Sequence, residues 1–204
     1  MVGKMTSLKF EILNLFRSNY SIQLHVREMA KLTKKSHVTL LSHLQALEKD
    51  KILISKTIGR NKQYSLNLDN IITKNYLTIS ETIATTSFIE QIFLIKKITK
   101  EILNINLLGT MIIFGSYAKK TFQEDSDIDL FFIGQITEQE IQKIRNIGKI
   151  YGKTINLKKS TFNNFESGLK KKDPLIIEII KNHIIIQNPE QFVHFLWRYY
   201  NEKR

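Results

Sequence analysis

The chain has 204 residues, and its 31 lysines and arginines outnumber its 19 aspartates and glutamates, which gives a formal charge of +12. It has no cysteine, so disulfides and thiolate metal sites are excluded. No apolar run reaches the roughly 18–20 residues that a membrane span needs. We therefore expect a soluble, cytoplasmic protein of two small domains, with a polyanionic partner and no membrane contact.

Hydrophobic periodicity predicts three helices and three extended pieces in the first seventy residues. The helices are expected over residues 6–16, 26–32 and 37–49. The extended pieces are expected over residues 21–25, 51–58 and 63–68. In the third helix we expect a buried stripe made of Val38, Leu41, Leu44 and Leu47, with Leu40 at its margin.

This order of elements resembles the winged helix-turn-helix of MarR/ArsR-like regulators, and Leu44-Gln-Ala-Leu-Glu-Lys-Asp-Lys-Ile-Leu-Ile54 resembles the segment that leads into their wing. The resemblance implies that the third helix enters the major groove of DNA and that the wing contacts phosphates. The same seventy residues carry twelve basic and five acidic residues. The alternative is a module for protein–protein contact or dimerisation. The residues expected at DNA are Lys35, Ser36, His37, Thr39, His43, Arg60 and Lys62.

The segment after the wing predicts two helices with a break between them. Residues 70–83 have a weak helical pattern, and residues 71–83 offer a surface for a homodimer. Thr85-Thr86-Ser87 is expected to interrupt the helix. An amphipathic helix is expected from Ser87 to about Ile105, since Ser87 followed by Glu90 is a capping-box pattern.

Two short motifs in the second half of the chain indicate a phosphate and metal site. An apolar run ends at Phe114 and is followed by Gly115-Ser116, and a second apolar run begins at Asp127-Ile128-Asp129. Successive side chains of a strand alternate between its faces, so the two aspartates point the same way. Their carboxylates repel each other unless a cation lies between them, and Mg²⁺ prefers such oxygen ligands.

At these residues the chain resembles the polymerase-β-like nucleotidyltransferase superfamily, in particular its minimal members, over roughly residues 90–190. The resemblance implies that Asp127 and Asp129 are catalytic and hold Mg²⁺. It implies that Gly115 and Ser116 hold the triphosphate of an NTP, with Lys119 and Lys120 beside the phosphates. The implied reaction transfers NMP to a hydroxyl acceptor and releases pyrophosphate.

One residue departs from the family pattern. Active members carry a third carboxylate on a later strand, expected here over residues 153–159, where the corresponding position holds Asn156. An amide cannot accept the acceptor's proton. Three alternatives follow: Glu166 or Asp173 substitutes as the base, metal coordination makes a base unnecessary, or the domain binds nucleotide without turnover.

The sequence thus predicts an α+β protein with an N-terminal winged helix-turn-helix and a mixed, nucleotidyltransferase-type sheet flanked by helices. The predicted domains are residues 1–70, a helical connector over 71–86, and residues 87–204. The predicted function is a DNA-binding nucleotidyltransferase-like protein that uses Mg-NTP. The alternative is a transcriptional regulator whose transferase domain is catalytically degenerate. One form of this alternative is a member of a toxin–antitoxin pair, which has a protein partner.

Overall fold

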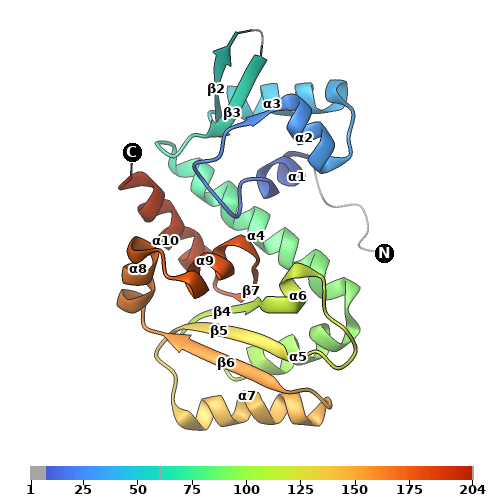
Figure 1. Cartoon of the computed structure of the whole chain (residues 1–204), viewed down its shortest axis with the longest axis vertical. Helices are drawn as coiled ribbons and strands as arrows, with labels where there is room; N and C mark the ends of the chain where they lie inside the picture. The colour runs from blue at the N-terminus through green and yellow to red at the C-terminus, as the bar shows by residue number, and fades with distance from the viewer. Residues whose placement is uncertain (1–7, 60, 204) are drawn as a thin grey trace. The chain divides into compact units, whose positions relative to one another are not determined.

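The structure, a computed structural model, describes residues 8–59 and 61–203 and divides into two units (Figure 1). Residues up to Ile83 and those from Val193 onward form the first unit, and Ala84–Phe192 form the second. The sequence assigned residues 193–204 to the nucleotidyltransferase-like domain, whereas here they group with the N-terminal elements. Within the described residues, no helix is long and apolar enough to cross a membrane.

The first unit contains helices and a three-stranded antiparallel sheet in the order β1-β3-β2. The hairpin is paired from Leu53 with Leu66 to Ile58 with Asn61, so Asn61 and Lys62, which the sequence left between the two extended pieces, belong to the second strand. The α+β class expected from the sequence is confirmed. The elements of this unit are α1 (Leu8–Asn14), β1 (Leu24–His25), α2 (Val26–Thr33), α3 (His37–Lys49), β2 (Leu53–Ile58), β3 (Asn61–Leu66) and the first part of α4 (Ile71–Gln91).

The buried stripe of α3 differs from the expected one. Leu40, Leu44 and Leu47 are fully buried at helical spacing, whereas Val38 is 77% exposed and Leu41 is half-buried. The expectation is confirmed for Leu44 and Leu47 and wrong for Val38 and Leu41, because packing against α1 and α2 buries the side of the helix that carries Leu40.

The C-terminal residues complete the core of the first unit. The rings of Tyr20 and Tyr200 lie 5.5 Å apart, and the Asn201 amide donates to the Leu68 carbonyl oxygen at 3.4 Å.

A buried ion pair lies in the same unit. Arg17 forms this ion pair with Glu81 at 2.5 Å, and the Glu81 side chain is only 1% exposed. Burial raises the pKa of the Tyr20 hydroxyl, and the Glu81 carboxylate adds to this effect.

The helix break expected at Thr85-Thr86-Ser87 is absent, and α4 continues to Gln91. Threonine hydroxyls along this helix bond to carbonyl oxygens, as Thr78 does to Lys74 and Thr85 does to Ile185, so threonine does not interrupt it. The capping box predicted at Ser87 is therefore wrong. The chain breaks instead at Ile92, whose extended backbone precedes α5 (Phe93–Leu103).

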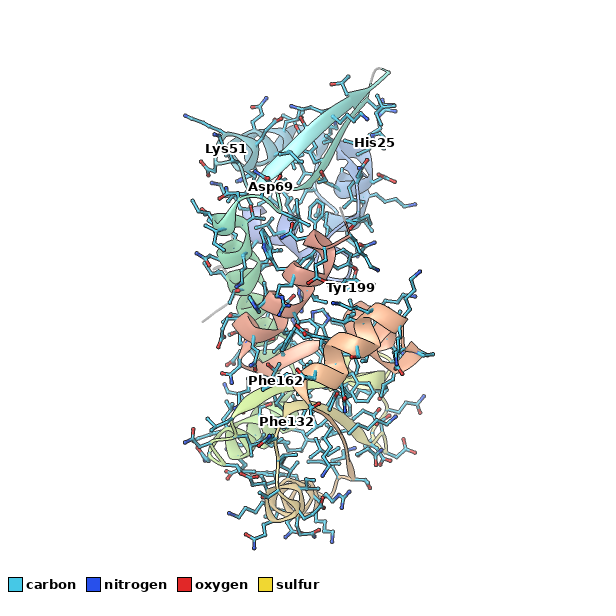
Figure 2. The ribbon with its side chains drawn as sticks, turned by 90° about the vertical axis from the view of Figure 1, so that its left-hand side faces the viewer. His25, Lys51, Asp69, Phe132, Phe162 and Tyr199 are labelled. Carbon is cyan, nitrogen blue, oxygen red and sulfur yellow. The ribbon has the colours of Figure 1, made fainter. Side chains whose placement is uncertain are left out.

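The second unit is built on a four-stranded mixed sheet in the order β6-β5-β4-β7. Strand β5 pairs antiparallel with β4 and parallel with β6. One face of the sheet packs on α5 and α7 through a core that includes Ile98, Ile144 and Phe132, the last labelled in Figure 2. The remaining elements are β4 (Gly109–Phe114), α6 (Gly115–Lys119), β5 (Ile128–Gly134), α7 (Glu138–Ile150), β6 (Ile155–Ser160), α8 (Phe162–Lys171), α9 (Pro174–Lys181) and β7 (Ile184–Gln187). Helix α10 (Pro189–Asn201) begins in this unit, and its residues from Val193 onward belong to the first unit.

Candidate functional site

Three neighbouring strands bring the predicted acids together at one end of the sheet. Phe114, the last residue of β4, pairs in register with Asp129 of β5, and Asp129 pairs with Asn156 of β6. The alternate residues Ile128 and Leu130 are fully buried in the core. The acids therefore lie on the opposite face, as the alternation of side chains predicted.

Gly115 lies against the carboxyl group of Asp129. Its φ is +67°, a left-handed conformation that favours glycine. A Cβ built on Gly115 would lie 3.0 Å from the Asp129 Cγ and 3.2 Å from its Cβ, and closer still to Oδ2. The glycine of the Gly-Ser motif is thus needed for two reasons, backbone conformation and space for the carboxylate.

Asn156 lies between the two aspartates. Its Nδ2 donates to Asp127 Oδ2 at 3.3 Å and to Asp129 Oδ1 at 3.4 Å. Both acids therefore point to the same side, with the Asn156 amide between them. An amide donor offsets part of the repulsion between two carboxylates, which a third acid would increase.

The predicted phosphate-binding residues lie on α6 and differ in their surroundings. Ser116 is half-buried, and its carbonyl oxygen accepts from Thr121 N at 3.0 Å. Lys119 forms an ion pair with Glu178 of α9 at 2.5 Å. Lys120 is exposed and ends the helix with a φ of +59°. Of the two lysines, Lys120 is therefore the better placed to meet an anionic ligand.

Lys153, which the sequence did not single out, holds the loop before the first acid. Its ammonium donates to the carbonyl oxygens of Glu124 and Ser126, and the Ile128 amide donates to the Thr154 carbonyl oxygen at 2.9 Å. A lysine at the start of a strand has no sequence signal for this role. Only the parallel pairing of β5 with β6 shows it.

Asp173, one of the two substitute acids considered for the base, has another role in the structure. Its Oδ1 accepts from the amides of Leu175 and Ile176, so it caps α9. Glu166 lies on α8 and is half-buried. In the part of the chain that is described, no group of three or more His, Cys, Asp or Glu residues could hold a metal.

The donor set nevertheless fits Mg²⁺. Asp127 is exposed, Asp129 is half-buried, and their carboxylates converge with only long amide hydrogen bonds to Asn156 between them. Mg²⁺ commonly takes one or two carboxylates and fills its other positions with water and substrate phosphates. Two converging aspartates are therefore enough for the protein's share of such a site.

Among the described residues predicted to contact DNA, Lys62 lies on the hairpin, His43 lies in the middle of α3, and the others lie at its N-terminus. Ser36 caps α3 by accepting from Thr39 N at 3.1 Å, and the two hydroxyls lie 2.6 Å apart. Lys35 lies 3.8 Å from Glu11, and His43 is half-buried. Arg60 lies outside the described residues.

Lys62 on the hairpin is paired with Glu48 of α3. The two atoms Nζ and Oε2 are 2.7 Å apart, and Ser55 also donates to Glu48. The hydrogen bond from Lys62 lowers the pKa of Glu48 from its usual 4.5, and the same bond raises the pKa of Lys62. Lys62 and His37 line a cavity of about 440 Å³ together with Arg27, which the sequence did not suggest.

Residues 95–186 match the family model described as nucleotidyltransferase domain. No curated protein and no solved structure matches the chain. The matched residues include β4, β5 and β6 with both motifs, so the match supports the nucleotidyltransferase-type domain that the sequence predicts for this part of the chain.

Proposed function

We propose that the second unit binds Mg-NTP and transfers NMP to a hydroxyl acceptor. The observation that carries this proposal is the convergence of Asp127 and Asp129 beside Gly115, within residues that match a nucleotidyltransferase domain. Asp127 and Asp129 would hold the metal, which when bound neutralises phosphate charge and polarises the phosphoryl group. Ser116 and Lys120 would contact the triphosphate.

In this reaction the acceptor oxygen attacks the α-phosphorus, the bond to the β-phosphate breaks, and pyrophosphate leaves. Catalysis of this kind consists mainly of positioning and charge stabilisation. Asn156 orients the two carboxylates through its amide hydrogens. Because an amide is no base, the proton of the acceptor leaves to water, and we expect a slow chemical step.

The test is calorimetric titration of the protein with each NTP, with and without Mg²⁺. We expect Mg²⁺-dependent binding that is lost in Asp127→Asn/Asp129→Asn. The matched control is Asp125→Asn, which removes an exposed acid from the same loop and should bind like the wild type. The proposal is overturned if no NTP binds, or if the double variant binds as well as the control.

A nucleotide-binding regulator without turnover is the second candidate, favoured by the amide at position 156. In both cases we propose that the first unit is a winged helix-turn-helix that binds DNA. The support is its order of helices and hairpin, with Lys35, His37 and Thr39 exposed at the start of α3. The double variant Arg60→Ala/Lys62→Ala should weaken DNA binding across sequences and make its salt dependence shallower. An unchanged slope would exclude the hairpin as a phosphate contact.

A further inference from the structure

A threonine hydroxyl lies beside the two-aspartate site. Thr154 directly precedes β6, the strand that forms one edge of the sheet (Figure 1). Strands β5 and β6 pair in parallel with Ile128 opposite Ile155, and the Ile128 amide donates to the Thr154 carbonyl oxygen at 2.9 Å. One step back along the same pairing, Thr154 therefore comes opposite Asp127, the first of the two acids.

The Thr154 side chain lies on the face of the sheet that carries the acids. Ile155 is buried in the core, whereas Thr154 and Asn156 on either side of it are exposed. Because side chains alternate along a strand, these two share a face. Asn156 donates to both aspartates, at 3.3 Å and 3.4 Å. The Thr154 hydroxyl is thus next along the same face to the amide that contacts both candidate metal ligands.

The hydroxyl of Thr154 is available for reaction. Within residues 8–59 and 61–203 it makes no hydrogen bond. The hydroxyl of Ser126, which directly precedes Asp127, is by contrast occupied, since it accepts from the Gln123 amide at 2.8 Å. An exposed hydroxyl without a partner loses no interaction within the protein when its oxygen becomes a nucleophile.

Space and positive charge for a nucleotide lie next to this hydroxyl. Thr154 and Asp129 line a cavity of about 650 Å³, which is within the size range of small-molecule sites. Its lining also includes the exposed cations Arg145, Lys149 and Lys158. Arginine and lysine bind phosphate oxygens well. The cavity therefore has room for a nucleotide attached to Thr154 and charge to balance its phosphodiester.

We propose that Thr154 is the hydroxyl acceptor of the transfer, so that the chain modifies itself with NMP. The proposal rests on the proposed function and names its acceptor. The Thr154 oxygen forms a bond to the α-phosphorus of the NTP, the bond from that phosphorus to the bridging oxygen of the β-phosphate breaks, and pyrophosphate leaves with the bonding electrons. The hydroxyl proton passes to water. The product is a phosphodiester between threonine and nucleoside, and nothing is oxidised or reduced.

The missing base favours an acceptor that belongs to the protein. A general base contributes about 10²–10⁴-fold to a rate, and the amide of Asn156 cannot supply this. A well-oriented reactant held in place reacts as if its concentration were about 10⁵–10⁸ M, a gain that outweighs the loss. Thr154 has this advantage, whereas an acceptor from solution must first bind. After the transfer the attached nucleotide occupies the cavity beside Asp129, so the reaction stops after one transfer per chain.

The experiment incubates the full chain with Mg²⁺ and each NTP and compares the intact mass of the protein before and after. We expect an increase equal to one NMP less water, and fragmentation should locate it on Thr154. Thr154→Val removes the hydroxyl at nearly constant size and should lower the modified fraction at least about tenfold, whereas Thr154→Ser keeps a hydroxyl and should still be modified. The matched control, Thr121→Val, removes another exposed hydroxyl of the second unit and should be modified like the wild type.

Two further measurements test whether the transfer is internal and self-limiting. The rate constant should not change on dilution of the protein, because the acceptor belongs to the same chain. The modified chain should no longer bind Mg-NTP in calorimetric titration, because its own nucleotide occupies the cavity. A rate constant that falls on dilution, undiminished Mg-NTP binding, modification at another residue, or equal loss in Thr154→Val and Thr121→Val would overturn the proposal. If Thr154→Val fails to fold, the position of the modification in the wild type decides.

Failure of this proposal is distinguishable from failure of the proposed function. If the chain binds Mg-NTP and no mass increase appears, Thr154 is not the acceptor and the nucleotide site stands. If no NTP binds and none is transferred, the proposed function is wrong and this proposal falls with it. Asp127→Asn/Asp129→Asn should abolish both binding and modification, and modification that persists in that folded variant would contradict both proposals.

Discussion

Replacing Gly115 with alanine tests the geometry of the candidate site directly. The new Cβ would lie 3.0 Å from Asp129 Cγ and still closer to Oδ2, and the backbone would keep a φ of +67° with a non-glycine residue. The left-handed backbone costs about 1–2 kcal/mol for alanine. Crowding in a packed site costs a further ~1–3 kcal/mol. We therefore expect Gly115→Ala to lower the free energy of unfolding by about 2–5 kcal/mol.

Gly152→Ala is the matched control. Gly152 has the same φ of +67°, but a Cβ there would meet nothing within 4 Å. This variant should therefore lose only the backbone cost of about 1–2 kcal/mol. The difference between the two variants, about 1–3 kcal/mol, measures the crowding against Asp129.

The assay is urea denaturation followed by far-UV circular dichroism, because both glycines lie in the second unit and the single tryptophan, Trp197, reports the first. Calorimetric titration with Mg-NTP then measures nucleotide binding by both variants. Gly115→Ala should lose nucleotide binding, since the displaced carboxylate is a proposed metal ligand, whereas Gly152→Ala should keep it. If the two variants lost equal stability and both bound nucleotide, the carboxylate would not lie over Gly115 and our reasoning about the motif would be refuted.

Three further predictions concern single interactions. Asn156→Asp should raise NMP transfer by about 10²–10⁴-fold if the missing base limits the reaction, measured with labelled NTP; an unchanged rate in a folded variant would show that no base is needed there. Glu48→Gln should free Lys62 and strengthen DNA binding in gel-shift titrations, whereas weaker binding would assign the pair a structural role at the interface. Because the pKa of Glu48 is lowered from 4.5, the contribution of its ion pair to stability is present at neutral pH and lost as the pH falls through the lowered pKa, so the urea midpoints of wild type and Glu48→Gln should converge in acid. Arg17→Met should cost about 3–5 kcal/mol by breaking the ion pair of the buried Glu81, and Arg17→Met/Glu81→Met should recover much of it; tryptophan fluorescence during urea unfolding would measure both, and a neutral single variant would contradict the importance of the pair.

The sequence alone predicted the strands of the second unit and the face on which its acids lie. Strand alternation is local, so Asp127-Ile128-Asp129 was sufficient to place two carboxylates opposite a buried Ile128. These inferences depend on neighbours in the chain, and local chemistry decides them.

Tertiary packing decided which of several possible local structures the folded chain adopts. The buried stripe of α3 is the one that includes Leu40, because partner helices select the face that packs. Helix α4 runs through Thr85, whose hydroxyl finds a carbonyl oxygen a hundred residues away. Asn156 lies between the acids, and Lys153 holds their loop, only because β6 pairs with β5 in parallel. Contacts between residues far apart in sequence carry no signal in a local window, so their consequences can be read only from the folded chain.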